Sequence, residues 1–311
     1  MNVGAWIIGT GLLAMACWML LRPVSLLRLM TELRCRTKGL ARGRIRTATA
    51  SWPTFMGGSK RNEITIIILH GFGVDSFTML PIAKMLVQEH HRVLLPDLPG
   101  FGYHRFNAAS IHNEAFMLEQ LESFAAAAGA SRVMVVGSSM GGALAAAWAH
   151  AHPERIVGAV LLDPAGVEAP VSTAVYTAAD DENPLDIRTM ADLERILELN
   201  FERPPSVPWI VRRDLVRLVR SRADHGEAII RALEPLLRNG MRDRLEHVRQ
   251  PVLLIWGEQD RIIDPSAVGI WMDGLPNAEL LLLDDCGHVP WGDQPISTLL
   301  AIREFTARIA S

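Results

Sequence analysis

The chain has 311 residues, a formal net charge of −3 and three cysteines. This length can bury the core of one α/β domain with an insertion, or at most of two domains. The weakly acidic balance provides no basic field for nucleic acid, so we expect no nucleic-acid partner. Cys17, Cys35 and Cys286 are too few and too scattered for a disulfide framework, and none lies in a Cys-x-x-Cys metal pair.

The N-terminal segment is apolar. No charged residue occurs from Val3 to Leu21, and a run of this length can cross a hydrocarbon core of roughly 30 Å. The basic residues follow this run, whereas a secretory signal peptide carries them before its apolar core. Residues 1–21 are therefore predicted to form a transmembrane anchor. The positive-inside rule then places the rest of the chain in the cytoplasm.

Residues 22–46 are predicted to be a basic juxtamembrane segment. They mix leucines with seven arginines and one lysine against the single acid Glu32. This composition favours a helix lying on an anionic lipid surface. Two alternatives stay open: a buried N-terminal helix of the globular domain, and a cleaved lipoprotein-type signal ending at Cys17. The second lacks the expected basic start.

The first buried strand is expected over residues 63–69, a β-branched run typical of a parallel sheet. It ends at His70-Gly71-Phe72-Gly73, whose glycines let the backbone turn over the sheet edge. The freed Phe72 N–H is a candidate donor to an oxyanion. His70 could act as a base, but we expect it to be a hydrogen-bonding scaffold residue because a better-placed histidine comes later.

The next elements are a helix over residues 75–89, a strand over 92–96 and a helix over 110–128. Asp97 follows the strand and precedes a Pro-Gly turn. It could be an acid/base group, but this context favours a role in organising the loop.

A strand, a sharp turn and a helix are predicted around Ser139. The β-branched run of residues 133–136 leads into Gly137-Ser138-Ser139-Met140-Gly141-Gly142, and an alanine-rich segment follows at once. Small residues two positions before and after the serine let strand and helix approach without a Cβ clash. Ser139 is the candidate nucleophile, and the Met140 N–H is the second candidate oxyanion donor. The alternative is a Gly/Ser turn that only joins strand to helix.

The helical insertion is expected between two strands of the sheet. A buried strand over residues 158–162 ends at Asp163-Pro164, and residues 165–248 then lack buried-strand patterns. Helical stretches over 189–199, 210–222 and 227–238 are separated by breakers at Pro204-Pro205 and Gly226. We expect a cap over the active site, with a solvated subdomain as the alternative. The core then consists of residues 47–164 and 249–311.

The last two strands carry the remaining candidates. A strand over residues 251–257 places Asp260 just beyond its end, and a strand over 279–283 is followed by His288. Asp260 is the preferred acid, with Asp264 and Asp163 as alternatives. A serine needs an imidazole to take its proton, and the imidazole needs a carboxylate to orient it. The carboxyl ends of parallel strands would bring Ser139, Asp260 and His288 to one edge of the sheet.

With these motifs the chain resembles α/β-hydrolases over residues 60–311, and within them the membrane-anchored monoacylglycerol-lipase-like proteins and their bacterial lipase relatives. The motifs that carry the resemblance are His70-Gly71-Phe72-Gly73, Pro96-Asp97-Leu98-Pro99-Gly100-Phe101-Gly102, Gly137-Ser138-Ser139-Met140-Gly141-Gly142, Asp163-Pro164-Ala165-Gly166, Trp256-Gly257-Glu258-Gln259-Asp260 and Gly287-His288-Val289-Pro290.

The resemblance implies an α/β fold with a mostly parallel sheet and a helical cap inserted before the strand of the triad acid. It also implies esterase or lipase activity on monoacylglycerol-like or other single-chain esters, without metal or organic cofactor. Two other functions stay open: C–C bond hydrolysis by the same triad, and a non-catalytic binding protein of the same fold.

Overall fold

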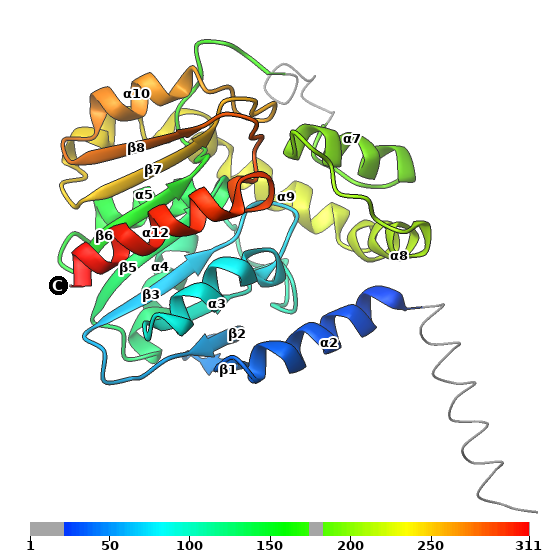
Figure 1. Ribbon diagram of the computed structural model, residues 1–311, viewed down its shortest axis with the longest axis horizontal. Coiled ribbons are helices and arrows are strands. Elements are labelled where there is room, and N and C mark those ends of the chain that lie inside the picture. The colour runs from blue at the N-terminus through cyan, green and yellow to red at the C-terminus, as the bar shows by residue number, and fades with distance from the viewer. Residues whose placement is uncertain (1–21, 174–182, 311) are drawn as a thin grey trace, which may run out of the picture.

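The computed structural model describes residues 22–173 and 183–310 (Figure 1). The apolar run of residues 3–21, predicted to be a transmembrane anchor, lies outside these ranges. Among the helices within them, none is both long and apolar enough to span a bilayer.

An eight-stranded sheet in the order β1-β2-β4-β3-β5-β6-β7-β8 forms the centre of the molecule. The pairs β1–β2 and β2–β4 are antiparallel, and all other neighbours are parallel. The predicted mostly parallel sheet is therefore confirmed. The strands are β1 (Leu40–Arg46), β2 (Ser51–Gly57), β3 (Ile64–Leu69), β4 (Arg92–Pro96), β5 (Arg132–Ser138), β6 (Ile156–Leu162), β7 (Val252–Gly257) and β8 (Ala278–Leu283).

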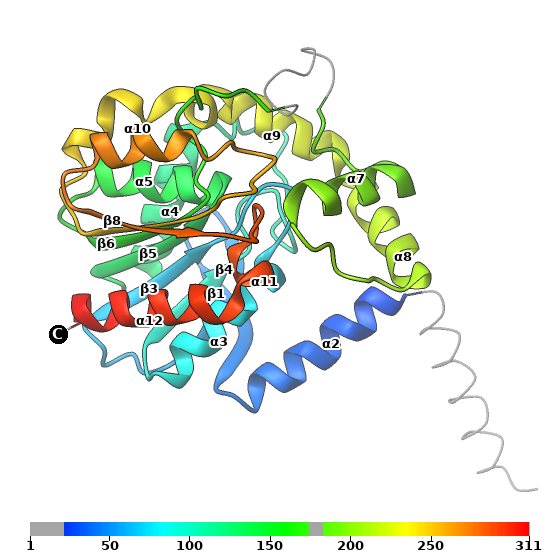
Figure 2. The same cartoon turned by 45° about the horizontal axis from the view of Figure 1, so that its top comes forward.

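Helices cover both faces of the sheet (Figures 1 and 2). Successive side chains of a strand point to opposite faces, so in β3 Ile67 packs into one core and Ile66 and Ile68 into the other. The first core also takes residues of α4 (Glu114–Ala127), α5 (Met140–Ala151) and α10 (Ala267–Gly274). The second takes residues of α3 (Leu80–Gln88), preceded by a short 3₁₀ helix at Ser76–Met79, and of α12 (Pro295–Ala310).

The sheet begins earlier in the chain than the sequence indicates. After α2 (Pro23–Arg36), β1 pairs with β2 over its whole length, from Leu40 opposite Gly57 to Arg46 opposite Ser51. Residues 40–46 were expected in the juxtamembrane segment, with the core starting at residue 47. Charged side chains are common on edge strands because they block pairing with other chains. Because of these arginines, the sequence of β1 does not show the pattern of a buried strand.

Two arginines of this N-terminal region are engaged inside the protein. Arg28 of α2 pairs with Asp75 at 2.6 Å, and Arg42 of β1 pairs with Asp97 at 3.2 Å. Both lie against the Tyr103 ring, which is 5.7 Å from the Arg28 guanidinium and 4.0 Å from that of Arg42. These two side chains are therefore not free to contact lipid headgroups, unlike the expectation for the whole segment.

Asp97 organises the loops at the carboxyl edge of the sheet, as predicted. Its side chain is fully buried. One carboxylate oxygen accepts the Ser76 N–H at 3.0 Å, and the other accepts the Tyr103 N–H at 2.8 Å and the Arg42 guanidinium. The loops after β3 and β4 are thus held to each other through one buried carboxylate.

Three helices of the segment between β6 and β7, here called the cap helices or the cap, lie beyond this edge (Figure 2). They are α7 (Met190–Asn200), α8 (Trp209–Arg220) and α9 (Ala223–Pro235). The prediction that Gly226 breaks a helix is wrong, because α9 runs through it. A Cβ at this position would lie 3.4 Å from the Phe72 ring, which is an ordinary van der Waals distance, so α9 passes directly beside that ring. In a helix interior glycine costs about 1 kcal/mol relative to alanine.

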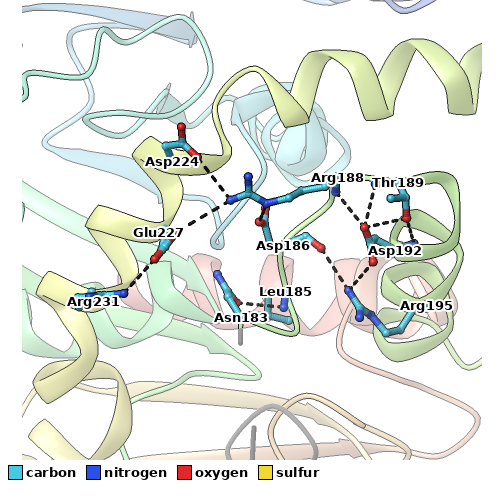
Figure 3. Close-up of polar contacts among 10 residues, drawn as sticks. All are labelled: Asn183, Leu185, Asp186, Arg188, Thr189, Asp192, Arg195, Asp224, Glu227 and Arg231. Atoms are coloured by element: carbon cyan, nitrogen blue, oxygen red, sulfur yellow. Dashed lines mark hydrogen bonds and ion pairs between the residues drawn. The ribbon is translucent and has the colours of Figure 1, made fainter. Parts of the chain in front are cut away.

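Polar contacts join the start of the cap to α9 (Figure 3). The Arg188 guanidinium pairs with Asp186 on its own segment and reaches Asp224 at 3.4 Å and Glu227 at 3.9 Å on α9. Next to it, Thr189 caps α7 and exchanges hydrogen bonds with Asp192. A capping box of this kind satisfies the free N–H groups of the first turn. These contacts fix the entrance of α7 relative to α9.

We expect Asp97→Ala to lower the free energy of unfolding by about 3 kcal/mol, because the buried Ser76 N–H and the Tyr103 N–H lose their acceptor and the largely buried Arg42 guanidinium loses one of its two carboxylate partners. Urea denaturation of the purified chain would measure this. The matched control is Glu63→Ala, since Glu63 is 84% exposed and pairs with the half-exposed Arg132. We expect the control to change stability by less than about 0.5 kcal/mol. Equal effects of the two substitutions would contradict the organising role of Asp97.

Candidate active site

Ser139 lies at a strained turn between β5 and α5. Its φ of 53° and ψ of −117° are unusual for a residue with a side chain, and such strain persists only where the surroundings enforce it. Here the Ser139 N–H donates to the Leu162 carbonyl at 2.9 Å, and its carbonyl accepts from Ala143 and Ala165. The residue is half-buried at the start of α5, whose first N–H groups lack partners within the helix.

Glycines allow the close approach that produces this turn. A Cβ at Gly137 would lie 2.1 Å from the Gly141 carbonyl oxygen, and one at Gly141 would lie 2.4 Å from that of Leu69. Both distances are far below any real contact. The predicted need for small residues on either side of the serine is therefore confirmed. The loop after β3 also comes near, since a Cβ at Gly71 would be 3.5 Å from the Cβ of Ser139.

His70 is part of the scaffold of this loop, as predicted. The fully buried ring accepts the Leu98 N–H at Nε2 at 3.0 Å, so its proton is on Nδ1, which contacts the Gly71 carbonyl at 2.8 Å. Burial lowers the pKa of His70, which favours the neutral ring. With both nitrogens occupied in this way, His70 joins the loops after β3 and β4.

Asp260 and His288 are brought into direct contact. The Asp260 Oδ2 lies 2.6 Å from the His288 Nδ1, and both side chains are buried. The other Asp260 oxygen accepts the N–H groups of Ile262 and Ile263 at 2.8 and 3.0 Å. These bonds fix the carboxylate and leave the Nε2 edge of the imidazole for another partner. Asp264, the alternative acid, instead accepts the Ser266 N–H just before α10.

Asp163, the other alternative acid, lies behind this pair. It follows β6 with a φ of 43°, is fully buried, and accepts the Gly257 N–H at 2.9 Å. One ligand atom each of Asp163, Asp260 and His288 lies within 4.8 Å of the others, and no other group in the described ranges has such spacing for a metal ion. The His288 Nδ1 is already bonded to Asp260, so the arrangement is that of an oriented imidazole.

The cap lies next to two of the site loops. A Cβ at Gly287 would lie 2.8 Å from the Asn200 carbonyl oxygen, so the end of α7 packs against the histidine loop. At the other side, the Phe72 ring lies under Gly226 of α9 and contacts Phe101 edge-on with centroids 5.9 Å apart. The cap therefore contacts both the loop that carries His288 and the loop that carries Phe72.

Asp293 is a residue of this region that the sequence analysis missed. Its Oδ2 accepts the N–H groups of Gly287 and Glu202, both at 2.9 Å, and so links the histidine loop to the chain after α7. It lies in the short helix α11 (Pro290–Asp293). The only signal was its distance of a few residues from His288 in the sequence.

Comparisons with known proteins agree with this architecture. The family model described as the alpha/beta hydrolase fold matches residues 64–295. Lipase 1 of Psychrobacter immobilis is 30% identical over 72% of this chain and 71% of its own length. Monoacylglycerol lipase ABHD6 of Bos taurus is 23% identical over 96% of this chain and 92% of its own.

A solved structure extends the similarity to nearly the whole chain. The crystal structure of a bacterial virulence factor described as a membrane phospholipase A superposes with a TM-score of 0.87 and 28% identity, covering 98% of this chain and 99% of that one. The sequence match, the mostly parallel sheet and the turn at Ser139 lead to one conclusion: the chain belongs to the α/β-hydrolase fold family.

Proposed function

We propose that this protein is a serine hydrolase that cleaves lipid esters through an acyl-enzyme intermediate. The contact between His288 and Asp260 carries the proposal, because an imidazole that is buried and bonded at Nδ1 presents Nε2 as a base. Ser139 would be the nucleophile. It lies in a strained turn at the carboxyl end of β5, a strand of the same sheet.

The reaction would proceed in two steps. Ser139 attacks the ester carbonyl while His288 takes its proton, and Asp260 stabilises the imidazolium that forms. The N–H groups of Phe72 and Met140 would hold the developing oxyanion. Met140 is the first residue of α5, and the Phe72 loop packs near Ser139 through Gly71. His288 then returns the proton to the leaving alcohol, and water releases the acid by the same route.

The substrate class follows from the relatives. Two of them are named lipase and monoacylglycerol lipase, and the solved structure is described as a membrane phospholipase A. We infer that the substrate is a monoacylglycerol-like or other single-chain lipid ester. The helices of residues 183–248 would form a cap over a core that comprises the sheet and its flanking helices.

We also propose that the protein is attached to a bilayer, with the catalytic domain in the cytoplasm. Residues 3–21 would be the single-pass anchor. The helix α2 that follows exposes Leu27, Leu29, Met30 and Leu33, and Arg34, Arg36 and Lys38 at its end are exposed as well. An exposed apolar face beside basic residues suits the surface of an anionic bilayer.

Ser139→Ala should reduce kcat for hydrolysis of a medium- or long-chain monoacylglycerol by roughly 10⁴-fold or more, because the triad acts as a unit. Release of fatty acid by the purified protein would measure this. The matched control is Ser138→Ala, which removes the neighbouring hydroxyl at the end of β5. We expect the control to keep most of the activity. Wild-type turnover in Ser139→Ala would exclude the proposed mechanism.

A double substitution of Leu12 and Leu13 by arginine should release the protein from membranes, because each charge at the centre of a spanning helix costs about 2.5–3.5 kcal/mol. Fractionation of cells followed by an alkaline carbonate wash would measure this. Replacement of the same two residues by isoleucine is the control and should leave the protein in the pellet. Retention of the arginine variant would count against an anchor in this segment.

A further inference from the structure

Asp163 is a buried acid without an evident function in the mechanism above. Its Oδ1 accepts one backbone N–H, that of Gly257. Its Oδ2 is buried and has no hydrogen-bond partner in the part of the chain that the structure describes. The residue is also held at a φ of 43°. A left-handed conformation is strained at a residue with a side chain, and strain of this kind persists only where the surrounding structure enforces it.

Asp260, next to it, is surrounded by donors. Two backbone N–H groups and the His288 ring bond to its two oxygens. Hydrogen bonds to the charged form of a carboxyl group stabilise that form. Of the two neighbouring acids, Asp260 is therefore the one whose surroundings favour the anion.

Two carboxylates this close cannot both keep a charge in a buried site. An atom of Asp163 lies within 4.8 Å of an atom of Asp260 and of His288, and the repulsion between like charges grows as water is removed. Burial raises the pKa of Asp163 well above its ordinary value, and the negative charge of Asp260 adds to this effect.

The other groups around Asp163 do not stabilise its charged form. Asp293 raises the pKa of Asp163 further. Burial raises the pKa of the Cys286 thiol, so it remains neutral. The remaining neighbour is the His288 ring, whose Nδ1 is bonded to Asp260.

We propose that Asp163 is protonated in the folded protein and donates a hydrogen bond to the Asp260 carboxylate. The two acids next to His288 then carry one negative charge between them. Its Oδ1 accepts from Gly257, which leaves Oδ2 to carry the hydrogen. Asp163 is then a positioning residue that acts through Asp260. Its role in catalysis rests on the proposed function, whereas the proton can be tested without any substrate.

The dependence of stability on pH tests the proton directly. Above about pH 4 the unfolded chain loses the proton of Asp163, whereas the folded protein keeps it. Stability of the wild type therefore falls with rising pH relative to Asp163→Asn, which has no proton to lose. Urea unfolding should give a ratio of the two unfolding constants, wild type over variant, that rises about tenfold per pH unit between pH 5 and 7.

The opposite trend, in which the variant loses stability relative to the wild type as pH rises, would overturn the proposal. Asp264→Asn is the matched control, because it removes a carboxyl that lies in the loop after β7, close in sequence to Asp260, and is only half-buried. Its ratio to the wild type should not show this tenfold slope.

A second measurement holds even if Asp163→Asn folds poorly. The infrared spectrum of the wild type at pH 7 should contain the carbonyl band of a protonated carboxyl group. We expect the band to persist in Asp264→Asn and to vanish in Asp163→Asn if that variant folds. A wild-type spectrum without the band would refute the proposal.

Activity then tests whether a neutral, hydrogen-bonding side chain at position 163 is sufficient to position Asp260. Asparagine can accept from Gly257 and donate to Asp260, so Asp163→Asn should keep kcat within a few-fold and leave the acidic limb of the kcat/KM profile in place. A shift of that limb to lower pH in Asp163→Asn would show that the substitution had removed a negative charge near the imidazole, which would contradict the proposal. If Ser139→Ala retained activity, the proposed function would fail while the stability and infrared results would still stand.

Discussion

The candidate site depends on a close approach of three backbone segments that only glycine permits. Strand β5, the start of α5 and the end of β3 meet at Gly137 and Gly141, where an added Cβ would lie 2.1 and 2.4 Å from carbonyl oxygens. This contact forces the strained backbone at Ser139 and places the first turn of α5 beside the loop after β3. The position of Ser139, the candidate nucleophile, and the positions of the candidate oxyanion donors Phe72 and Met140 thus depend on packing of the main chain.

Aspartate carboxylates then hold the loops around this turn. The buried Asp97 joins the loops after β3 and β4, the buried Asp260 fixes the ring of His288, and the half-buried Asp293 connects the histidine loop to the cap. Each accepts at least two hydrogen bonds, which offset the loss of water around a carboxylate. Within the described residues Asp163 accepts one, and this difference is the physical reason to assign it the neutral state.

The sequence predicted those parts of the fold that depend on local patterns. Buried strands such as β3 and β5 read as β-branched runs, and Ser139, Asp260 and His288 follow the parallel strands β5, β7 and β8, whose carboxyl ends lie at one edge of the sheet. The sequence failed where tertiary contacts override the pattern. The arginines of β1 obscure the pattern of an edge strand, Gly226 lies inside α9 and does not end it, and the role of Asp293 depends on a contact with the distant Glu202.

The most direct test of the central claim is the site of covalent labelling by a serine-reactive phosphonate. After digestion, mass spectrometry should find the adduct on Ser139, and an excess of monoacylglycerol should slow its formation. Such a result would show an activated serine in a site that the lipid ester occupies. No adduct, or an adduct on another residue, would contradict the assignment of Ser139, His288 and Asp260 as a catalytic triad.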